Sequence, residues 1–376
     1  MIKIPEHIQK LKPYKAGKPI EELAREKGIQ KIVKLASNEN PLGPSPKAVE
    51  EIKKHVNELH RYTNPSAYKL VSAIAEKYDK RPGQIVTGSG SDSLIQYLIT
   101  AFSDDDDELL SSEGTFIGWY VNVNKYGRKS KLVPLKNYHL DLDAITEGIN
   151  NKTKIIYLAN PNNPTGTMFT RREFEDFISR VPEDVLVVLD EAYTVYAESN
   201  PDYPNGLTYD LDNLLVLRTL SKAYGLAGIR IGFAFGKEYL INEMYKVKLP
   251  FEPNELAQDA AIAALQDDTF LKATVDLNSE SLDMMKKGLE EIGIDYVPTS
   301  ANFFLILFPD EEFTAEFNAE CLNRGLILRH VNTFGIPNGI RINSGTIEET
   351  EFALNVLEEV YNSMELKYGR KAENKA

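Results

Sequence analysis

The chain has 376 residues and a mass of 42.3 kDa, which is enough for two or three domains with a substantial core. Its composition, 42% hydrophobic and 26% charged, excludes a disordered or collagenous chain. The formal net charge of −13 argues against nucleic acid or an anionic membrane as the main partner, because both require a basic surface.

The first 45 residues form a predicted N-terminal arm with a segment of the small domain, since prolines and glycines punctuate them. A short helix is expected at 20–26. From residue 46 to 260, helices alternate with apolar runs that predict strands at 84–87, 154–159, 185–189 and 214–217. Helices are expected at 91–102 and after Thr170, which opens a capping-box pattern with Glu173. This alternation predicts a large α/β domain with a mostly parallel sheet.

Residues 261–376 change character and predict a smaller C-terminal α+β domain. A helix-rich stretch at 256–289 leads out of the large domain. Strands are expected at 302–308, 326–330 and 339–343, with a helix around 313–324 between the first two. A final helix begins at Thr346, again with a capping-box pattern.

The cysteine content and the apolar runs bear on location and metal binding. One cysteine, Cys321, excludes an internal disulfide and a cysteine-based metal cluster. No secretory signal is evident, and the longest apolar runs are far shorter than a membrane span. We therefore expect a cytoplasmic protein without a metal site.

Ligands of open α/β sheets bind beyond the carboxyl ends of the strands, so the residues that follow each strand are candidates for a site. The strand at 84–87 leads into Gly90, Ser91 and Asp92, which open a helix whose free N–H groups suit a phosphate. Ser93 stands where a dinucleotide fingerprint has its third glycine, so this loop alone fits a capped turn equally well.

Three further strand ends carry polar groups. The strand at 154–159 is followed by a Pro-rich loop that holds Asn163, and the strand at 185–189 by Asp190 and Tyr193. A carboxylate directly after an apolar strand is costly to desolvate unless it meets a cationic partner. The strand at 214–217 leads into a glycine-rich loop with Lys222, a candidate for a sheltered amine that forms a Schiff base. The same loop carries Thr219, Ser221 and Arg230.

Pyridoxal phosphate (PLP) is one cofactor that needs all these groups together. Lys222 offers the amine and Asp190 the carboxylate that keeps the ring nitrogen protonated. The phenolic oxygen, the phosphate and the ring face would be served by Asn163, Tyr193, Gly90, Ser91, Ser221, Arg230 and Phe116.

Three motifs resemble those of the fold-type I, class I and II aminotransferases: Asn160-Pro-Asn-Asn-Pro-Thr-Gly166, Asp190-Glu-Ala-Tyr193, and Ser221-Lys222 followed by Gly228-Ile-Arg230. The stretch from Lys34 to Pro46, with His60-Arg-Tyr62, resembles more narrowly the histidinol-phosphate aminotransferase family. The resemblance runs from about residue 11 to 360. It implies the fold-type I architecture of PLP-dependent transferases, a large sheet domain plus a smaller α+β domain, and a homodimer with shared active sites.

The resemblance also implies residue roles. Lys222 would bind the cofactor and carry the proton, Asp190 would pair with the ring nitrogen, and Tyr193 would bond the phenolic oxygen. The other residues implied at the cofactor are Gly90, Ser91, Asp92, Phe116, Asn163, Thr219, Ser221, Arg230 and Tyr62 of the partner subunit. The substrate's anionic end would meet Tyr14, Asn163, Arg329 and Arg341.

The implied reaction is transamination of L-histidinol phosphate with 2-oxoglutarate, giving imidazole-acetol phosphate and L-glutamate in histidine biosynthesis. Departures from the family pattern lie on the substrate side, at 112–120, 63–64 and 332–335. An aminotransferase acting on phenylalanine or tyrosine therefore stays open, as does a PLP-dependent decarboxylase or C–S lyase. A PLP-binding regulatory protein without turnover is disfavoured, because binding alone needs no proton carrier such as Lys222.

Overall fold

The computed structural model describes residues 2–11, 28–29 and 31–368 and is organised around a seven-stranded sheet. The strand order is β2-β8-β7-β6-β5-β3-β4. The strands are β2 (Ile85–Gly88), β3 (Glu108–Ser112), β4 (Lys129–Val133), β5 (Thr153–Ala159), β6 (Leu186–Asp190), β7 (Leu214–Thr219) and β8 (Gly232–Phe235). Strands β3 to β7 pair in parallel, and β8 runs antiparallel to both its neighbours. The predicted mostly parallel sheet is confirmed.

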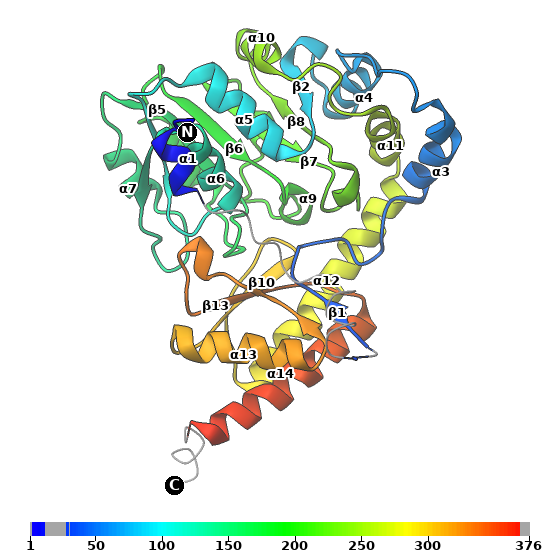
Figure 1. The fold of residues 1–376 in the computed structure, drawn as a ribbon, viewed down its shortest axis with the longest axis vertical. Coiled ribbons are helices and arrows are strands. Elements are labelled where there is room, and N and C mark those ends of the chain that lie inside the picture. The colour runs from blue at the N-terminus through cyan, green and yellow to red at the C-terminus, as the bar shows by residue number, and fades with distance from the viewer. Residues whose placement is uncertain (1, 12–27, 30, 369–376) are drawn as a thin grey trace.

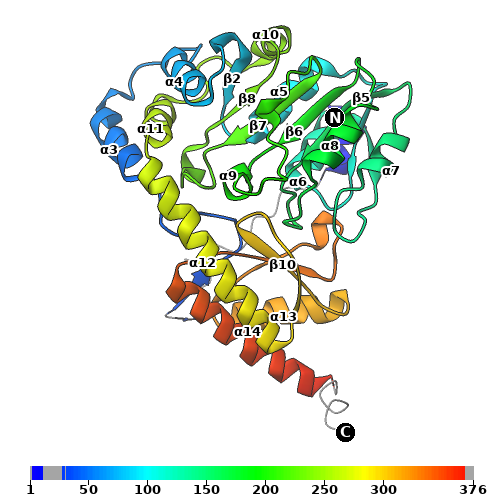
Figure 2. The ribbon, with the colours of Figure 1, turned by 180° about the vertical axis from the view of Figure 1, so that it is seen from behind.

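Helices cover both faces of this sheet (Figures 1 and 2). One face carries α5 (Ser91–Phe102), α6 (Ile117–Lys125) and α10 (Glu238–Val247), which share an apolar cluster with the strands. The second cluster joins the sheet to α3 (Pro46–His55), α4 (Tyr68–Tyr78), α7 (Leu142–Glu147), α8 (Arg171–Ile178) and α11 (Glu255–Leu265). Because apolar side chains cover both faces, the inner strands are continuous apolar runs rather than alternating ones. Two short helices complete this part, α1 (Glu6–Lys10), packed on α6, and α9 (Thr194–Ala197).

A second, smaller layered unit lies below the large sheet in Figure 1. Its four-stranded sheet has the order β12-β13-β10-β9. The strands are β9 (Asp295–Val297), β10 (Phe303–Leu307), β12 (Arg329–His330) and β13 (Gly339–Asn343). The helices are α12 (Asp268–Ile292), α13 (Glu311–Asn323) and α14 (Ile347–Lys367). Figure 2 shows α12 connecting the two units, with its far end beside α14.

The prediction of a single strand at 326–330 is wrong. The segment forms two strands in different sheets: β11 (Leu326–Ile327) pairs in parallel with β1 (Val33–Lys34), and β12 pairs with β13. The partner of β11 comes from almost 300 residues earlier in the chain, so local periodicity carried no sign of it.

Other expectations fare differently. Both predicted capping boxes, at Thr170 and Thr346, are present and start α8 and α14. The helix expected at 20–26 lies outside the described residues, and the domain boundaries at 45/46 and 260/261 stay a prediction. Across the described parts of the chain, every helix is too short or too polar to cross a lipid bilayer.

Candidate active site

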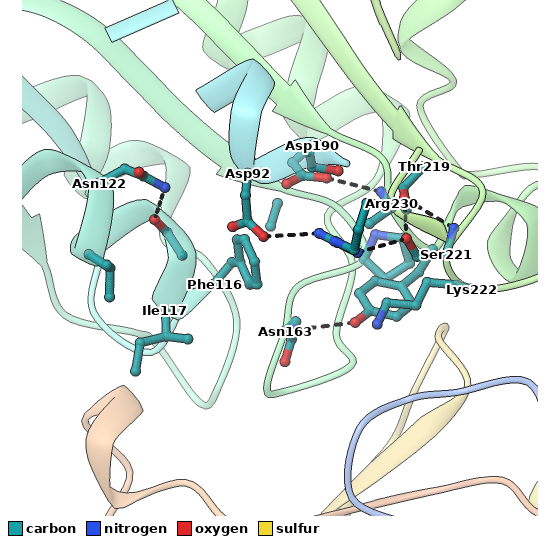
Figure 3. A pocket seen from close by; sticks show the side chains of 17 residues that line it. Asp92, Phe116, Ile117, Asn122, Asn163, Asp190, Thr219, Ser221, Lys222 and Arg230 are labelled. Carbon is teal, nitrogen blue, oxygen red and sulfur yellow. Dashed lines mark hydrogen bonds and ion pairs between the residues drawn. The ribbon is translucent and has the colours of Figure 1, made fainter. Parts of the chain in front are cut away.

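A cavity of about 390 Å³ opens beyond the carboxyl ends of β5, β6 and β7 (Figure 3). Each of these strands sends polar residues into it, and the starts of α5 and α6 close the opposite side. Twelve of the lining residues lie at a strand end, in a loop between elements or at a helix start: Ser91, Asp92, Phe116, Ile117, Gly118, Pro161, Asn163, Asp190, Tyr193, Ser221, Lys222 and Arg230. Parallel strands thus gather at one edge residues that lie up to 139 positions apart in sequence (91 to 230).

The start of α5 forms an anion-binding end of the cavity. Gly90, which precedes α5, has a φ of 82°, and a Cβ there would lie 2.5 Å from Nη2 of Arg230. The missing side chain lets the Arg230 guanidinium approach the free N–H groups of the helix. Arg230 also reaches Asp92 Oδ2 at 3.3 Å and Ser221 Oγ at 3.5 Å. A guanidinium, a hydroxyl and a helix N-terminus at one place suit a phosphate group.

Thr219 fixes the position of Ser221 at this end of the cavity through two hydrogen bonds. Its hydroxyl donates to Ser221 Oγ at 3.0 Å and accepts from the Ser221 backbone N–H at 3.1 Å. The two contacts fix the turn between β7 and Lys222, so the hydroxyl groups and the amine keep their relative positions.

Asp190 ends β6 and is 4% exposed. Its Oδ2 accepts a hydrogen bond from the Tyr157 hydroxyl at 2.6 Å, and its Oδ1 accepts one from the Ala192 N–H at 3.1 Å. Burial raises the pKa of this carboxyl to about 6, and the two hydrogen bonds oppose the rise. At neutral pH the group is therefore mostly ionised and prepared for a cationic partner.

Nζ of Lys222 lies over the Tyr193 ring, 5.9 Å from its centre. The amine donates a hydrogen bond to the carbonyl oxygen of Ser37 at 3.3 Å. Burial, and then the positive charges of Arg341 and Arg230, lower the pKa of Lys222 to about 8. A substantial fraction of the amine is neutral, and so nucleophilic and basic, near physiological pH.

A chain of hydrogen bonds links Tyr193 to Arg341. The Tyr193 hydroxyl accepts from Nδ2 of Asn38 at 2.8 Å and from Nδ2 of Asn163 at 3.2 Å. The Oδ1 of Asn163 accepts from Nη1 of Arg341 at 2.5 Å. Since the arginine can only donate, it fixes which end of the Asn163 amide faces Tyr193.

Arg341 and Arg329 lie side by side on β13 and β12, because their positions pair in the sheet. The Arg341 guanidinium donates to the carbonyl oxygen of Ala36 at 2.7 Å and contacts the rings of Phe303 and Phe334, at 5.4 and 6.0 Å from their centres. Arg329 contacts the same Phe334 ring at 5.8 Å. The small unit therefore places the Arg341 guanidinium against Asn163, with Arg329 at the paired position of the neighbouring strand.

Four predicted residues are not among those that line the cavity: Gly90, Tyr62, Arg329 and Arg341. The side chain of Tyr62 is 84% exposed and stacks on Phe251 with 4.4 Å between the ring centres. Tyr14 lies outside the described residues. Phe116, by contrast, lines the cavity as expected, and its ring lies against Gly118, where a Cβ would overlap it.

Two buried polar contacts were missed by the sequence analysis. Asn38 holds the Tyr193 hydroxyl, and Tyr157 holds the Asp190 carboxylate. Tyr157 could have been flagged, because a hydroxyl within an otherwise apolar strand needs a buried partner. Asn38 gave no such signal, since it lies in a loop more than 150 residues from Tyr193.

The cavity's groups fit PLP. A buried carboxylate, an amine with a lowered pKa, a tyrosine hydroxyl, an aromatic ring and a phosphate-binding helix start surround one space. The strongest indication of a phosphate site is the space at Gly90. Because this residue has no side chain, Arg230 and the N–H groups at the start of α5 can bind the same anion.

Comparison with known proteins agrees with this donor set. Residues 30–357 match the family model "Aminotransferase class I and II". The chain belongs to the class I and II aminotransferases. Histidinol-phosphate aminotransferase 2 of Hydrogenovibrio crunogenus is 41% identical over 365 residues, which cover 96% of this chain and 97% of that protein. Histidinol-phosphate aminotransferase 2 of Carboxydothermus hydrogenoformans is 41% identical over 355 residues, covering 94% of this chain and 98% of that protein.

Solved structures of this family share the fold. The crystal structure of histidinol-phosphate aminotransferase from Sinorhizobium meliloti in complex with pyridoxal-5'-phosphate superposes with a TM-score of 0.89 at 26% identity. It covers 97% of this chain and 99% of its own. The expected fold-type I architecture is thereby confirmed, and so is the aminotransferase assignment.

Proposed function

We propose that this PLP-dependent aminotransferase moves the amino group of L-histidinol phosphate to 2-oxoglutarate, giving imidazole-acetol phosphate and L-glutamate. The observation that carries the proposal is the meeting of Lys222, Asp190 and the phosphate-binding start of α5 in one cavity. The histidinol-phosphate aminotransferases that resemble the chain over almost its whole length favour this donor over phenylalanine or tyrosine. They also favour transamination over decarboxylation or C–S cleavage.

The cofactor-binding residues act at distinct parts of PLP. Ser91, Ser221 and Arg230 hold the phosphate with the N–H groups at Gly90 to Asp92, and Thr219 fixes the position of Ser221. Phe116 covers the ring on one side. Asp190 pairs with the ring nitrogen, while Asn163 and Tyr193 bond the phenolic oxygen.

Lys222 carries the proton in the proposed reaction. Bound PLP supplies a carbonyl that links to amino groups and a ring that takes up the electron pair left by a departing proton. The Lys222 amine, with its pKa near 8, removes the proton from the amine-bearing carbon of the donor and returns it on the cofactor side. Tyr193 and the ionised Asp190 keep the ring's charge distribution fixed while this transfer takes place.

Arg341 and Arg329 bind the substrate's anionic end in this proposal. They must accept a phosphate in one half of the reaction and a carboxylate in the other, and a guanidinium fork suits both. Arg341 is held by two hydrogen bonds and two rings, so its position is the same for either partner. Tyr14 is proposed at the same end of the substrate.

The donor is tested on the purified, PLP-loaded enzyme. Its visible absorption band is followed while histidinol phosphate, glutamate, phenylalanine or tyrosine is added singly. We expect histidinol phosphate and glutamate each to bleach the band, because each donates its amino group. Bleaching by glutamate and phenylalanine but not by histidinol phosphate would contradict the proposed donor.

We further propose a homodimer in which Tyr62 bonds the PLP phosphate of the partner's site. An exposed apolar surface supports it: Val56, Leu59, Tyr62, Leu249 and Phe251 are each more than 40% exposed. Tyr62 does not line the cavity of its own chain, and it is exposed and stacks on Phe251, where a second copy would reach it.

Replacing Tyr62 with phenylalanine should weaken PLP binding roughly tenfold or more, since hydrogen bonds to charged groups contribute about 1.5–3 kcal/mol. Titration of cofactor-free enzyme with PLP measures the change. Tyr239→Phe is the matched control, because Tyr239 is exposed and donates only to the carbonyl oxygen of Asp212. A fully active monomer at high dilution would exclude the shared site.

The remaining assignments rest on sequence. We propose an N-terminal arm and small-domain segment at 1–45, a large PLP-binding domain at 46–260 and a small domain at 261–376. We also propose a cytoplasmic location, which suits a chain whose single cysteine, Cys321, is buried and free.

A further inference from the structure

A buried tyrosine, Tyr157, holds the Asp190 carboxylate. Tyr157 lies on β5, directly opposite Val188 of β6, and Asp190 follows Val188 by two residues on the same face of the sheet. The Tyr157 side chain is completely buried, and its hydroxyl donates to Asp190 Oδ2 at 2.6 Å. The carboxylate lines the cavity, whereas the tyrosine that holds it is not among the lining residues.

Trp119 holds the tyrosine ring in place. The two rings are almost parallel, at 8°, with 4.6 Å between their centres, and both are completely buried. Trp119 belongs to α6, the same helix that follows Phe116 at the cavity wall. The indole N–H finds no acceptor among the described residues, so the packing of the ring face is what Trp119 contributes.

The hydrogen bond opposes an unfavourable electrostatic setting. Burial disfavours the Asp190 anion, and the nearby carboxylates of Asp92 on α5 and Glu191 on β6's C-terminal side disfavour it further. The groups that favour the anion are the Tyr157 hydroxyl and the Ala192 N–H, one on each carboxylate oxygen. Tyr157 itself remains a donor, because burial and Asp190 raise the pKa of its hydroxyl well above the usual range.

We propose that Tyr157, clamped by Trp119, is a positioning residue that keeps the Asp190 carboxylate ionised and aimed at the ring nitrogen of bound PLP. The proposal rests on the proposed role of Asp190 and adds the device that sets its charge and direction. Without the hydroxyl, Oδ2 would lose its fixed donor, and the carboxyl would be easier to protonate and free to turn.

Tyr157→Phe tests this, since it removes one oxygen and keeps the ring stacked on Trp119. We expect PLP affinity, measured by titrating the cofactor-free protein, to fall roughly tenfold at neutral pH. The acidic limb of the pH dependence of PLP binding should move upward by about one pH unit, because losing the donor raises the pKa of Asp190. With the loaded enzyme, kcat should fall while KM for glutamate stays nearly constant.

Tyr97→Phe is the matched control. Tyr97 lies on α5 in the same apolar cluster, is 5% exposed, and its hydroxyl has no partner among the described residues. Its loss should leave the PLP affinity and the acidic limb unchanged. Trp119→Phe keeps the Tyr157 hydroxyl but removes part of the stacking that holds its ring. The acidic limb of PLP binding should therefore move upward, as in Tyr157→Phe, but by less.

Several outcomes would overturn the proposal. A Tyr157→Phe protein that binds PLP like the parent at every pH shows that the hydroxyl does not set the charge of Asp190. A lowered melting temperature with an unmoved acidic limb assigns Tyr157 to packing alone. If Tyr157→Phe does not fold, an unmoved limb in Trp119→Phe overturns it instead. Asp190→Asn distinguishes the proposed role of Asp190 from that of Tyr157. If Asp190→Asn loses activity and PLP affinity while Tyr157→Phe keeps both, the role of Asp190 stands and the role of Tyr157 is excluded.

Discussion

Replacing Lys222 with alanine should lower kcat for transamination by about 10⁴-fold, the upper end of what general acid–base catalysis contributes. The variant loses the amine that we propose binds PLP covalently and carries the proton between donor and cofactor. Single-turnover absorbance changes with glutamate measure the loss. The visible band of the resting enzyme should also change before any donor is added.

Lys272→Ala is the control for this change, because Lys272 is exposed and paired with Asp276 far from the cavity. It should leave both kcat and the spectrum as they are. An unchanged resting spectrum in Lys222→Ala would contradict the assignment of Lys222 as the residue that binds the cofactor.

The lowered pKa of Lys222 also affects the stability of the cofactor-free protein. The pKa is about 8 in the fold and 10.5 for an ordinary lysine, so the unfolded chain holds this proton more tightly. The resulting destabilisation is fully present below pH 8 and disappears as the pH rises from 8 to 10.5. Lys222→Met should therefore unfold at a higher denaturant concentration than the parent at pH 7, and the difference should shrink above pH 8.

Replacing Asp190 with asparagine should lower kcat by about 10²–10³-fold, the loss typical of removing one buried electrostatic stabiliser. The amide keeps the shape of the carboxylate but not its charge, so the ring nitrogen of PLP would lose its anionic partner. Rates with glutamate, and PLP affinity of the cofactor-free protein, measure the two consequences separately.

The control for Asp190→Asn is Asp106→Asn. The Asp106 side chain is 99% exposed and pairs with Lys129 at the surface. Asp190→Asn with the kcat and PLP affinity of the parent would remove Asp190 from the proposed mechanism, whatever Tyr157 does.

Much of the cavity lining could be predicted from the sequence, because parallel strands bring their carboxyl ends to one edge of the sheet. Asn163, Asp190 and Lys222 each follow an apolar run, and this position alone placed them together. A glycine turn before α5 could also be predicted, and the structure gives its physical reason: φ at Gly90 is 82°, and a Cβ there would lie 2.5 Å from Nη2 of Arg230.

The contacts that hold these groups could not be predicted in the same way. Asn38 bonds Tyr193 from a loop 155 positions away, and Tyr157 on β5 bonds Asp190 on the neighbouring strand β6. Arg341 of the small sheet meets Asn163 only because the loop that follows β5 reaches the small unit. Neither hydrophobic periodicity nor a motif encodes which distant side chains will share a hydrogen bond.

The sequence by itself determined the alternation of strands and helices, the strand-end residues and the family, because all three depend on local patterns. Only the tertiary structure decided that 326–330 divides between two sheets and that Trp119 packs on Tyr157 behind Asp190. It also set the pKa of Lys222 near 8 and that of Asp190 near 6. Those values follow from burial and from neighbouring charges, which exist only once distant segments have packed together.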